Sequence, residues 1–494
     1  MTTNPYPAGD LTLEERAVKE FQLRVVCPDD GKYAQKDLTP YLSAEAEWLA
    51  CVEVQRVLLA TRVDFGAEAT IEDLRTLESA LPNIDVLNIA LLEATGTKPD
   101  QLAVLAEMGR VTDEHILSLL HPGTTSYDIL DTARSYLLKK AWNEKMRKLV
   151  VSVVEKILHI AEEFITPGDD GKIRAIQVGR THFQHTSPVP FGVTLVGYAA
   201  RLSERMSKCD ISFDSLRGKV SGIVGTQASV GTVIGKDRAM EFEEKALARL
   251  GLKPDLTATQ IVQKEGLSDV GHSIVGLMGV LADFANDMRL LYSSEIAEVT
   301  SMDAEKRLGG SSADAGKNNP IHWENIAGKF AVVESGMRVL YSLITTDFQR
   351  DLRGSVQARY QPNMMIAETY ESFARALKEL DQLTIREQQM AANLDGVRKS
   401  PTEALVAILR KYAWRHSEHG VGHDFVKKMA QKAKKEQKLL IEICQGDAEF
   451  QTLWNEKITD EEKAVLGGKI ELYIGTSLER AKVNIAFARA NVAA

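Results

Sequence analysis

Residues 274–291 read IVGLMGVLADFANDMRLL and carry the clearest secondary-structure pattern in the chain. The large apolar side chains recur three or four residues apart, at Ile274, Leu277, Leu281, Phe284, Met288 and Leu291. This spacing places them on one face of an α-helix and predicts a long helix with a single apolar stripe. Such a helix needs other helices against which to bury the stripe.

The same periodicity recurs in other segments. It predicts further helices over 129–164, 191–216 and 323–340. Long helices with few turns between them indicate an all-α fold organised as a helical bundle, and we expect its apolar faces to support oligomerisation.

Length and composition limit the class of protein. The 494 residues are too many for one ordinary core and indicate two or three domains. The net charge of −9 argues against a nucleic-acid binder. No apolar run is long enough for a membrane helix, and the start of the sequence does not read as a signal peptide. Four widely separated cysteines fit free thiols and no CxxC site. We therefore expect a cytoplasmic protein.

Three irregular segments interrupt the helical pattern. They are Thr166–Gly171 (TPGDDG), Gly218–Gly235 and Arg307–Pro320 (RLGGSSADAGKNNP). The third has too many glycines for a helix and is long enough to be a lid. Its serines, lysine and asparagines suit the binding of a carboxylate beside a proton to be removed, although a plain solvent loop has the same composition.

Three motifs together resemble the fumarase/aspartase superfamily. They are HPGTTSYDILDT at 121–132, GRTHFQHTSPVPFG at 179–192 and GSSADAGKNNP at 310–320. In that superfamily three separated signature regions meet in one active site built from different subunits. The first two motifs contain a TSxD and a GRTH core and are similar to those of the adenylosuccinate lyase family.

Two further segments resemble the nucleotide-binding parts of that family. QRDLRGSVQAR at 349–359 has Arg350, Ser355 and Arg359 at the spacing that holds the nucleotide, and DGKY near the start supplies Lys32 and Tyr33. Guanidinium groups offer forked donors that match phosphate oxygens. The resemblance spans roughly residues 30–380.

The resemblance implies a stepwise β-elimination. Ser311 matches the catalytic base that removes a proton from the succinyl carbon next to a carboxylate. Lys317 and Asn319 would stabilise the carbanion as its charge spreads onto that carboxylate. His182 would protonate the departing nitrogen, and Glu324 would orient His182 and stabilise its charged form.

The resemblance also assigns substrate contacts. Thr125, Ser126 and Gln260 would hold the succinyl carboxylates, and His121 would touch the substrate. Each assignment has a structural alternative: a histidine can cap or pack, Glu324 can favour a helix N-terminus, and the arginines can form ordinary ion pairs.

Three departures loosen the substrate assignment. Asp314-Ala315 replaces Met-Pro in the signature loop, Pro99 stands where a histidine usually precedes an aspartate, and Lys264-Glu265 replaces Arg-Asp. A divergent lyase acting on another N-succinyl or aspartate-like amine therefore remains open, as does a catalytically silent homologue. Fumarase and argininosuccinate lyase fit the motifs less well.

Together these features predict an enzyme of purine biosynthesis that cleaves adenylosuccinate to AMP and fumarate, and the related succinylated imidazole carboxamide nucleotide. We expect a small-molecule nucleotide substrate, no metal or organic cofactor, and a homotetramer. The expected domains are an N-terminal one (1–120), a central bundle (121–380) with its signature loop at 303–320, and a C-terminal one (381–494). His416, His419 and His423 have no recognised ligand spacing and are predicted to lie in a solvated segment rather than at a metal.

Overall fold

The long helices expected from the periodicity are present in the computed structural model, which describes residues 35–94, 100–169, 171–301 and 317–493. Helix α13 (Glu265–Leu291) contains the quoted stretch. Every residue of its predicted stripe is buried, from Leu277 at 0% exposed to Leu291 at 8%. The predicted all-α fold is confirmed, with only short two-stranded pairs besides the helices.

The other predicted helices are confirmed as well. Residues 129–164 lie in α8 (Ser126–Ala141) and α9 (Arg147–Ile165), which a single π-helical turn joins. The remaining two predictions correspond to α10 (Phe191–Asp214) and α15 (Ile321–Ser342). The prediction of an irregular 218–235 segment is wrong in its second half, because Ala228–Ile234 form helix α11.

The chain divides into two compact units. Unit 1 comprises Met1–Lys148, Ile211–Ile274 and Val332–Glu371, and unit 2 comprises Leu149–Asp210, Val275–Ala331 and Ser372–Ala494. Several helices contribute residues to both units, namely α9, α10, α13, α15 and α16 (Ser355–Gln382). The division into three domains at residues 120 and 380 remains a prediction.

Unit 1 is built around α3 (Ala44–Asp64), which packs along α8. Ser43 begins α3 as its N-cap by accepting a hydrogen bond from the Ala46 amide. One apolar cluster joins α3 and α8 to most of the smaller helices of the unit, though not to α2. These and the strands of the unit are α2 (Thr39–Leu42), α4 (Ile71–Ala80), α5 (Val86–Ala94), α6 (Gln101–Val111), α7 (Glu114–Leu119), α12 (Ala239–Ala248), β3 (Arg217–Gly218) and β4 (Lys253–Pro254).

The bundle segments of unit 1 are closely packed. A Cβ atom on Gly271 of α13 would lie only 2.2 Å from Leu340 Cδ1 of α15, so a side chain here would force the end of Leu340 to move. Nearby, Ser212 of α10 and Ser273 of α13 share a buried hydrogen bond of 2.7 Å. The helices in this part of the bundle approach one another without room for larger residues.

Unit 2 contains bundle segments joined by aromatic contacts. Phe284 of α13 packs between Tyr198 of α10 and Trp323 of α15, with ring centroids 5.1 and 5.5 Å away. Its other elements are β1 (Ile176–Thr181), β2 (Gln184–Pro190), β5 (Val299–Ser301), β6 (Leu383–Ile385), α17 (Glu387–Asn393), α18 (Asp395–Lys399), α19 (Thr402–Lys411), β7 (Arg415–His416), β8 (Gly420–Val421), α20 (Gly422–Glu436), α21 (Leu440–Gln445), α22 (Ala448–Glu456), α23 (Asp460–Leu466) and α24 (Ser477–Ala493).

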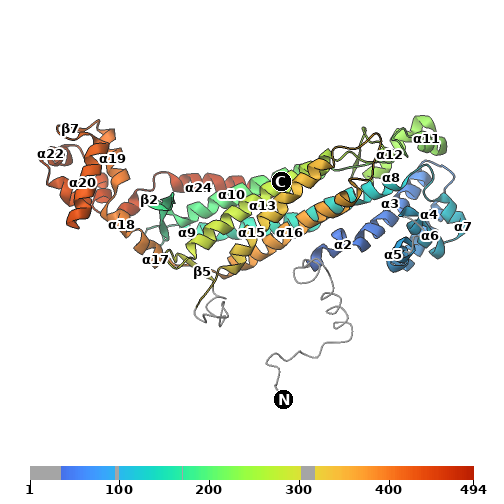
Figure 1. Ribbon diagram of the computed structural model, residues 1–494, viewed down its shortest axis with the longest axis horizontal. Coiled ribbons are helices and arrows are strands. Elements are labelled where there is room, and N and C mark those ends of the chain that lie inside the picture. Colours follow the sequence, from blue (N-terminus) through green and yellow to red (C-terminus); the bar gives the residue numbers. More distant parts are fainter. Residues whose placement is uncertain (1–34, 95–99, 170, 302–316, 494) are drawn as a thin grey trace, which may run out of the picture. The chain divides into compact units, whose positions relative to one another are not determined.

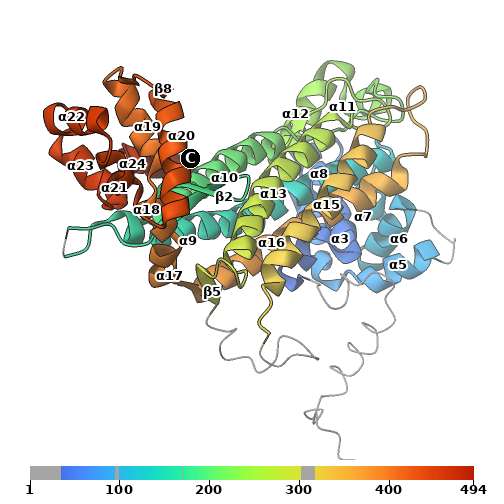
Figure 2. The same ribbon diagram turned by 60° about the vertical axis from the view of Figure 1, so that its left-hand side comes forward.

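Helices α19–α23 lie together (Figure 1 and Figure 2), and they share one small apolar core. His416 packs against this core: the residue is buried, and its Nε2 lies 3.0 Å from Asp447 Oδ2. The predicted solvated segment is therefore wrong for His416, because its ring also stacks on His419 and Phe425. The described residues contain no cluster that could hold a metal ion. Nor is any described helix long and apolar enough to cross a membrane.

Candidate active site

His182 stands at the tip of the β1–β2 hairpin in unit 2. Thr181 pairs with Gln184, so His182 and Phe183 form a two-residue turn. Both have positive φ, 54° and 58°, as a type I′ hairpin turn requires. Left-handed backbone is uncommon at a bulky residue such as Phe183, and the surrounding structure must hold it in place. The His182 side chain is exposed, as a group that meets a substrate must be.

A buried ion pair fixes the base of this hairpin. Arg180 donates two hydrogen bonds to Glu298, of 2.5 and 3.1 Å, and Glu298 is fully buried. Asn393 Nδ2 donates a third to the same carboxylate at 2.8 Å. Within the GRTH motif, Arg180 therefore has a positioning role, since its bidentate pair sets the direction of the turn that carries His182.

Glu324 is exposed in the first turn of α15, with its amide bonded to the Pro320 carbonyl at 3.0 Å. Within the described part of one chain, no hydrogen bond joins Glu324 to His182, and its orienting role stays a prediction. Lys317 and Asn319 precede α15 in a segment without regular secondary structure, and Lys317 is exposed while Asn319 is partly buried. Ser311, Lys32, Tyr33, Pro99 and Asp314 lie outside the described residues.

In unit 1, the TSxD core is anchored by its aspartate. Asp128 is fully buried and accepts a hydrogen bond from the ammonium of Lys219, itself fully buried. Asp128 also accepts backbone hydrogen bonds from Thr125 at 2.7 Å, Ser221 at 2.9 Å and Gly222 at 3.2 Å. This single carboxylate fixes the start of α8, and with it the positions of Thr125 and Ser126.

His121 lies just ahead of that core, in a left-handed conformation with φ of 68°. Its Nδ1 is 2.9 Å from Gln55 Nε2. In this arrangement the Gln55 amide nitrogen donates to Nδ1 of His121. Burial lowers the pKa of His121 below its ordinary value.

This pKa shift predicts a pH-dependent contribution to stability. As pH falls through the ordinary histidine pKa of about 6.5, the unfolded chain takes up a proton at His121 that the folded chain resists, so stability is lost toward acid. We expect the drop in melting temperature between pH 8 and pH 5.5 to be smaller in His121→Gln than in wild type. His159→Gln, an exposed histidine of α9, is the control. An equal drop in His121→Gln and wild type would contradict the prediction.

Around Tyr127 in unit 1, two of the predicted nucleotide-binding residues meet Gln260, which is predicted to hold a succinyl carboxylate. The Arg350 guanidinium carbon lies 3.6 Å from the centroid of the Tyr127 ring. Arg350 also donates to Gln260 Oε1 at 3.0 Å. The Tyr127 hydroxyl is 2.8 Å from Ser355 Oγ. The fold therefore brings Gln260, Arg350 and Ser355 together, and Tyr127, the variable residue of the TSxD core, is a member that the motif did not reveal.

Lys264 is close to this group. It donates to Asp131 Oδ2 at 2.7 Å, and together with Tyr127, Arg350 and Ser355 it lines one small pocket. The Lys-for-Arg departure therefore keeps a cation beside the predicted nucleotide-binding residues.

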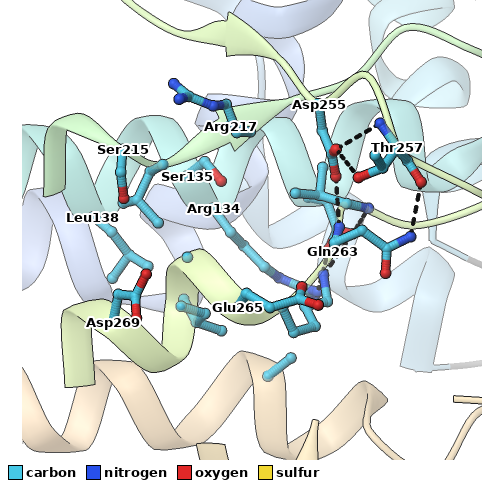
Figure 3. A pocket seen from close by; sticks show the side chains of 17 residues that line it. Arg134, Ser135, Leu138, Ser215, Arg217, Asp255, Thr257, Gln263, Glu265 and Asp269 are labelled. Atoms are coloured by element: carbon cyan, nitrogen blue, oxygen red, sulfur yellow. Dashed lines mark hydrogen bonds and ion pairs between the residues drawn. The ribbon is translucent and has the colours of Figure 1, made fainter. Parts of the chain in front are cut away.

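A second pocket of about 340 Å³ shares Asp131 and Lys264 with the first. Figure 3 shows its lining, in which Asp255 is bonded to Thr257 and Gln263. Arginine and carboxylate side chains both line it, so it suits a ligand with polar groups of either sign.

Arg359 is in a different environment. Its Nε lies 3.2 Å from Glu47 Oε1, and Glu47 also receives two hydrogen bonds from Arg134, of 3.0 and 3.2 Å. The Arg359 side chain lines a separate pocket with Glu47 and Arg134. Its charge is therefore partly neutralised within the chain, whereas no carboxylate pairs with Arg350 among the described residues.

The described candidate residues fall into two sets. The predicted substrate-binding residues lie in unit 1, namely His121, Thr125, Ser126, Gln260, Arg350, Ser355 and Arg359. The predicted catalytic residues lie in unit 2, namely His182, Lys317, Asn319 and Glu324. The residues predicted to bind the substrate anion therefore lie in unit 1, and those predicted to transfer protons and stabilise the carbanion lie in unit 2.

Comparison with known proteins gives consistent relatives. A family described as lyase matches residues 90–334. An adenylosuccinate lyase of Pyrococcus abyssi is 28% identical over 385 residues, 77% of this chain and 79% of the relative. One from Archaeoglobus fulgidus is 25% identical over 465 residues, covering 92% and 97%. Among solved structures, a fumarate lyase from Mesorhizobium sp. BNC1 shares the fold, with a TM-score of 0.76 at 19% identity, covering 92% of this chain and 98% of that one.

Proposed function

We propose that the chain is a lyase of the fumarase/aspartase superfamily, which its three motifs resemble, and that it cleaves adenylosuccinate to AMP and fumarate. The related succinylated imidazole carboxamide nucleotide, which carries the same phosphate and succinyl groups, is the proposed second substrate. Both reactions break a carbon–nitrogen bond by β-elimination, and both belong to purine biosynthesis.

The observation that carries the proposal is the environment of Arg350. Its partners are a neutral ring and a neutral amide, so its positive charge remains available to a ligand. Ser355 lies beside it at the first position of α16, where the helix dipole favours an anion. A guanidinium, a hydroxyl and a helix N-terminus together form a suitable phosphate site.

The proposed chemistry uses Ser311 and the predicted catalytic residues of unit 2. Ser311 takes the proton from the succinyl carbon next to a carboxylate, and the negative charge spreads onto that carboxylate near Lys317 and Asn319. The electron pair then forms the double bond of fumarate as the carbon–nitrogen bond breaks. His182 gives its proton to the departing nitrogen, which leaves as the amino group of AMP. The exposure of His182 at the hairpin tip supports this role.

We further propose that the active site is completed by assembly. A homotetramer in the cytoplasm would bring the substrate-binding residues of one chain to the catalytic residues of others. The proposed steps need only side chains and the substrate.

The test compares two substrates that differ only by the phosphate. Purified protein is given adenylosuccinate or its dephosphorylated nucleoside, and fumarate release is followed. We expect kcat/KM for the nucleotide to exceed that for the nucleoside by about 100-fold or more, because charge-assisted hydrogen bonds to phosphate contribute about 1.5–3 kcal/mol each. Equal rates, or no release from either, would contradict the proposal and favour a lyase acting on another N-succinyl amine.

Arg350→Ala and Arg359→Ala form a matched pair within that assay. We expect Arg350→Ala to raise KM for adenylosuccinate about 10- to 100-fold, since it removes an arginine that no carboxylate neutralises. Arg359→Ala should raise KM less, because Glu47 already partly neutralises that arginine. With the dephosphorylated nucleoside, Arg350→Ala should have little effect on KM. A larger effect of Arg359→Ala would show that the phosphate lies at the Glu47 side instead.

A further inference from the structure

Tyr127 is buried at the second position of α8, only 5% exposed, and contacts two of the predicted phosphate-binding residues. Its ring face lies under the Arg350 guanidinium, and its hydroxyl reaches Ser355 Oγ. The motif comparison gives this position no role, because it is the unspecified residue between Ser126 and Asp128. We propose that Tyr127 is a positioning residue that orients Arg350 and Ser355 toward a phosphate, an inference that rests on the proposed function.

The ring determines the plane of the guanidinium. A guanidinium stacked at 3.6 Å lies against the ring face, and its N–H donors then point outward in its own plane. One of these donors is used by Gln260 at 3.0 Å, which fixes rotation within that plane. The remaining donors are thereby directed before any ligand arrives. Such pre-organisation lowers the entropic cost of binding an anion.

The hydroxyl determines which way Ser355 donates. A serine hydroxyl has one hydrogen, and it can be given either to Tyr127 or to a ligand. When the Tyr127 hydroxyl donates to Ser355 Oγ, the serine hydrogen is left for a phosphate oxygen. The tyrosine and the serine then form a short hydrogen-bond chain that ends on the anion, and chains of this kind polarise their members.

Tyr127 itself is fixed independently of the ligand. The next residue, Asp128, is held by Lys219 and by three backbone amides, and Tyr127 belongs to the apolar core of unit 1. The Tyr127 side chain is therefore held in place before the substrate binds. We expect substitutions of Tyr127 to weaken phosphate binding and to leave the chemical step unchanged, so that KM rises while kcat does not.

Isothermal titration with AMP, inorganic phosphate and adenosine tests this assignment. Tyr127→Phe keeps the ring and loses only the hydroxyl, and we expect it to bind AMP about 2- to 10-fold more weakly. Tyr127→Leu loses the ring too, and we expect about 10- to 30-fold weaker binding. Adenosine affinity should change in neither. Tyr136→Phe, on the same helix and stacked with Lys140 instead, is the control and should bind AMP like wild type.

A double-mutant cycle with Ser355→Ala isolates the hydroxyl. Because the hydroxyl acts through Ser355, the double variant Tyr127→Phe/Ser355→Ala should bind AMP no more weakly than Ser355→Ala alone. Full additivity, wild-type affinity in Tyr127→Phe, or a fall in kcat with unchanged KM would each overturn the assignment. Tyr127→Phe changes no packing volume, so the cycle decides the matter even where Tyr127→Leu fails to fold.

Titration and turnover separate the two proposals. If AMP binding depends on Tyr127 as expected and adenylosuccinate releases no fumarate, the positioning role stands and the proposed function fails. If fumarate is released and Tyr127→Phe binds AMP like wild type, the function stands and the positioning role fails. If the wild-type protein binds neither AMP nor inorganic phosphate, the positioning role is wrong.

Discussion

Replacing His182 with asparagine is expected to lower kcat for adenylosuccinate about 10²- to 10⁴-fold, the usual contribution of general acid–base catalysis. Asparagine tolerates the left-handed conformation that the hairpin turn imposes at φ of 54°, so the hairpin should keep its shape. Its amide cannot give a proton to the departing nitrogen near neutral pH. The loss should therefore appear in kcat, measured by fumarate release at saturating substrate.

His185→Asn is the matched control, since His185 is an exposed histidine on the same hairpin and pairs with Arg180 across it. We expect its kcat to stay within a few-fold of wild type. A His182→Asn variant with near-normal kcat, or a His185→Asn variant with the larger loss, would move the general acid to another residue. Circular dichroism of both variants shows whether the fold is retained.

The sequence predicted the helices well because their signal is local. The stripe in 274–291 repeats at the period of an α-helix, and its residues are buried as predicted. The helix in 228–234 was missed because a segment rich in Gly, Ser and Thr has weak helical propensity, and its helix depends on tertiary contacts. The prediction for His416 was wrong because its surroundings are also tertiary: the residue that it hydrogen-bonds, Asp447, is 31 residues away in the sequence.

The candidate residues could be named from the motifs, but the buried ion pairs that hold them in place could not. Arg180 and Glu298 are 118 residues apart, and Asp128 and Lys219 are 91 apart. No periodicity or local spacing connects such partners. Nothing in the sequence assigns Tyr127 to the site, because an aromatic residue near a helix start is most often part of the core. Its contact with Arg350, more than two hundred residues later, exists only in the fold.

The contrast between Arg350 and Arg359 has the same origin. Both arginines lie in one eleven-residue motif, and by sequence alone they are equivalent candidates for a phosphate. The fold places a tyrosine ring beside the first and a glutamate beside the second. A cation with neutral partners keeps its charge for a ligand, and a cation beside a carboxylate already has a partner. We therefore expect the two residues to differ in phosphate binding, for a reason that their spacing in the sequence does not show.

Removing one partner of the buried Lys219–Asp128 pair is expected to cause the largest loss of stability. Both side chains are fully buried, so Lys219→Met strands a carboxylate and Asp128→Asn strands an ammonium. Breaking such a pair costs about 3–5 kcal/mol, because the remaining charge stays buried without its ionic partner. We expect each variant to lose that much free energy of unfolding in urea titrations at fixed protein concentration.

The double variant Lys219→Met/Asp128→Asn should be less destabilised than the sum of the two, since neither charge is then stranded. Lys245→Met, which breaks an exposed pair with Glu241 one turn away on α12, is the control and should lose less than about 0.5 kcal/mol. Strict additivity in the double variant would mean that the pair contributes through packing rather than charge.

Because Asp128 also holds the Thr125 amide at 2.7 Å, the same substitutions should weaken substrate binding at temperatures where the protein is still folded. A single carboxylate thereby couples the stability of unit 1 to the geometry of the residues proposed to hold the succinyl group.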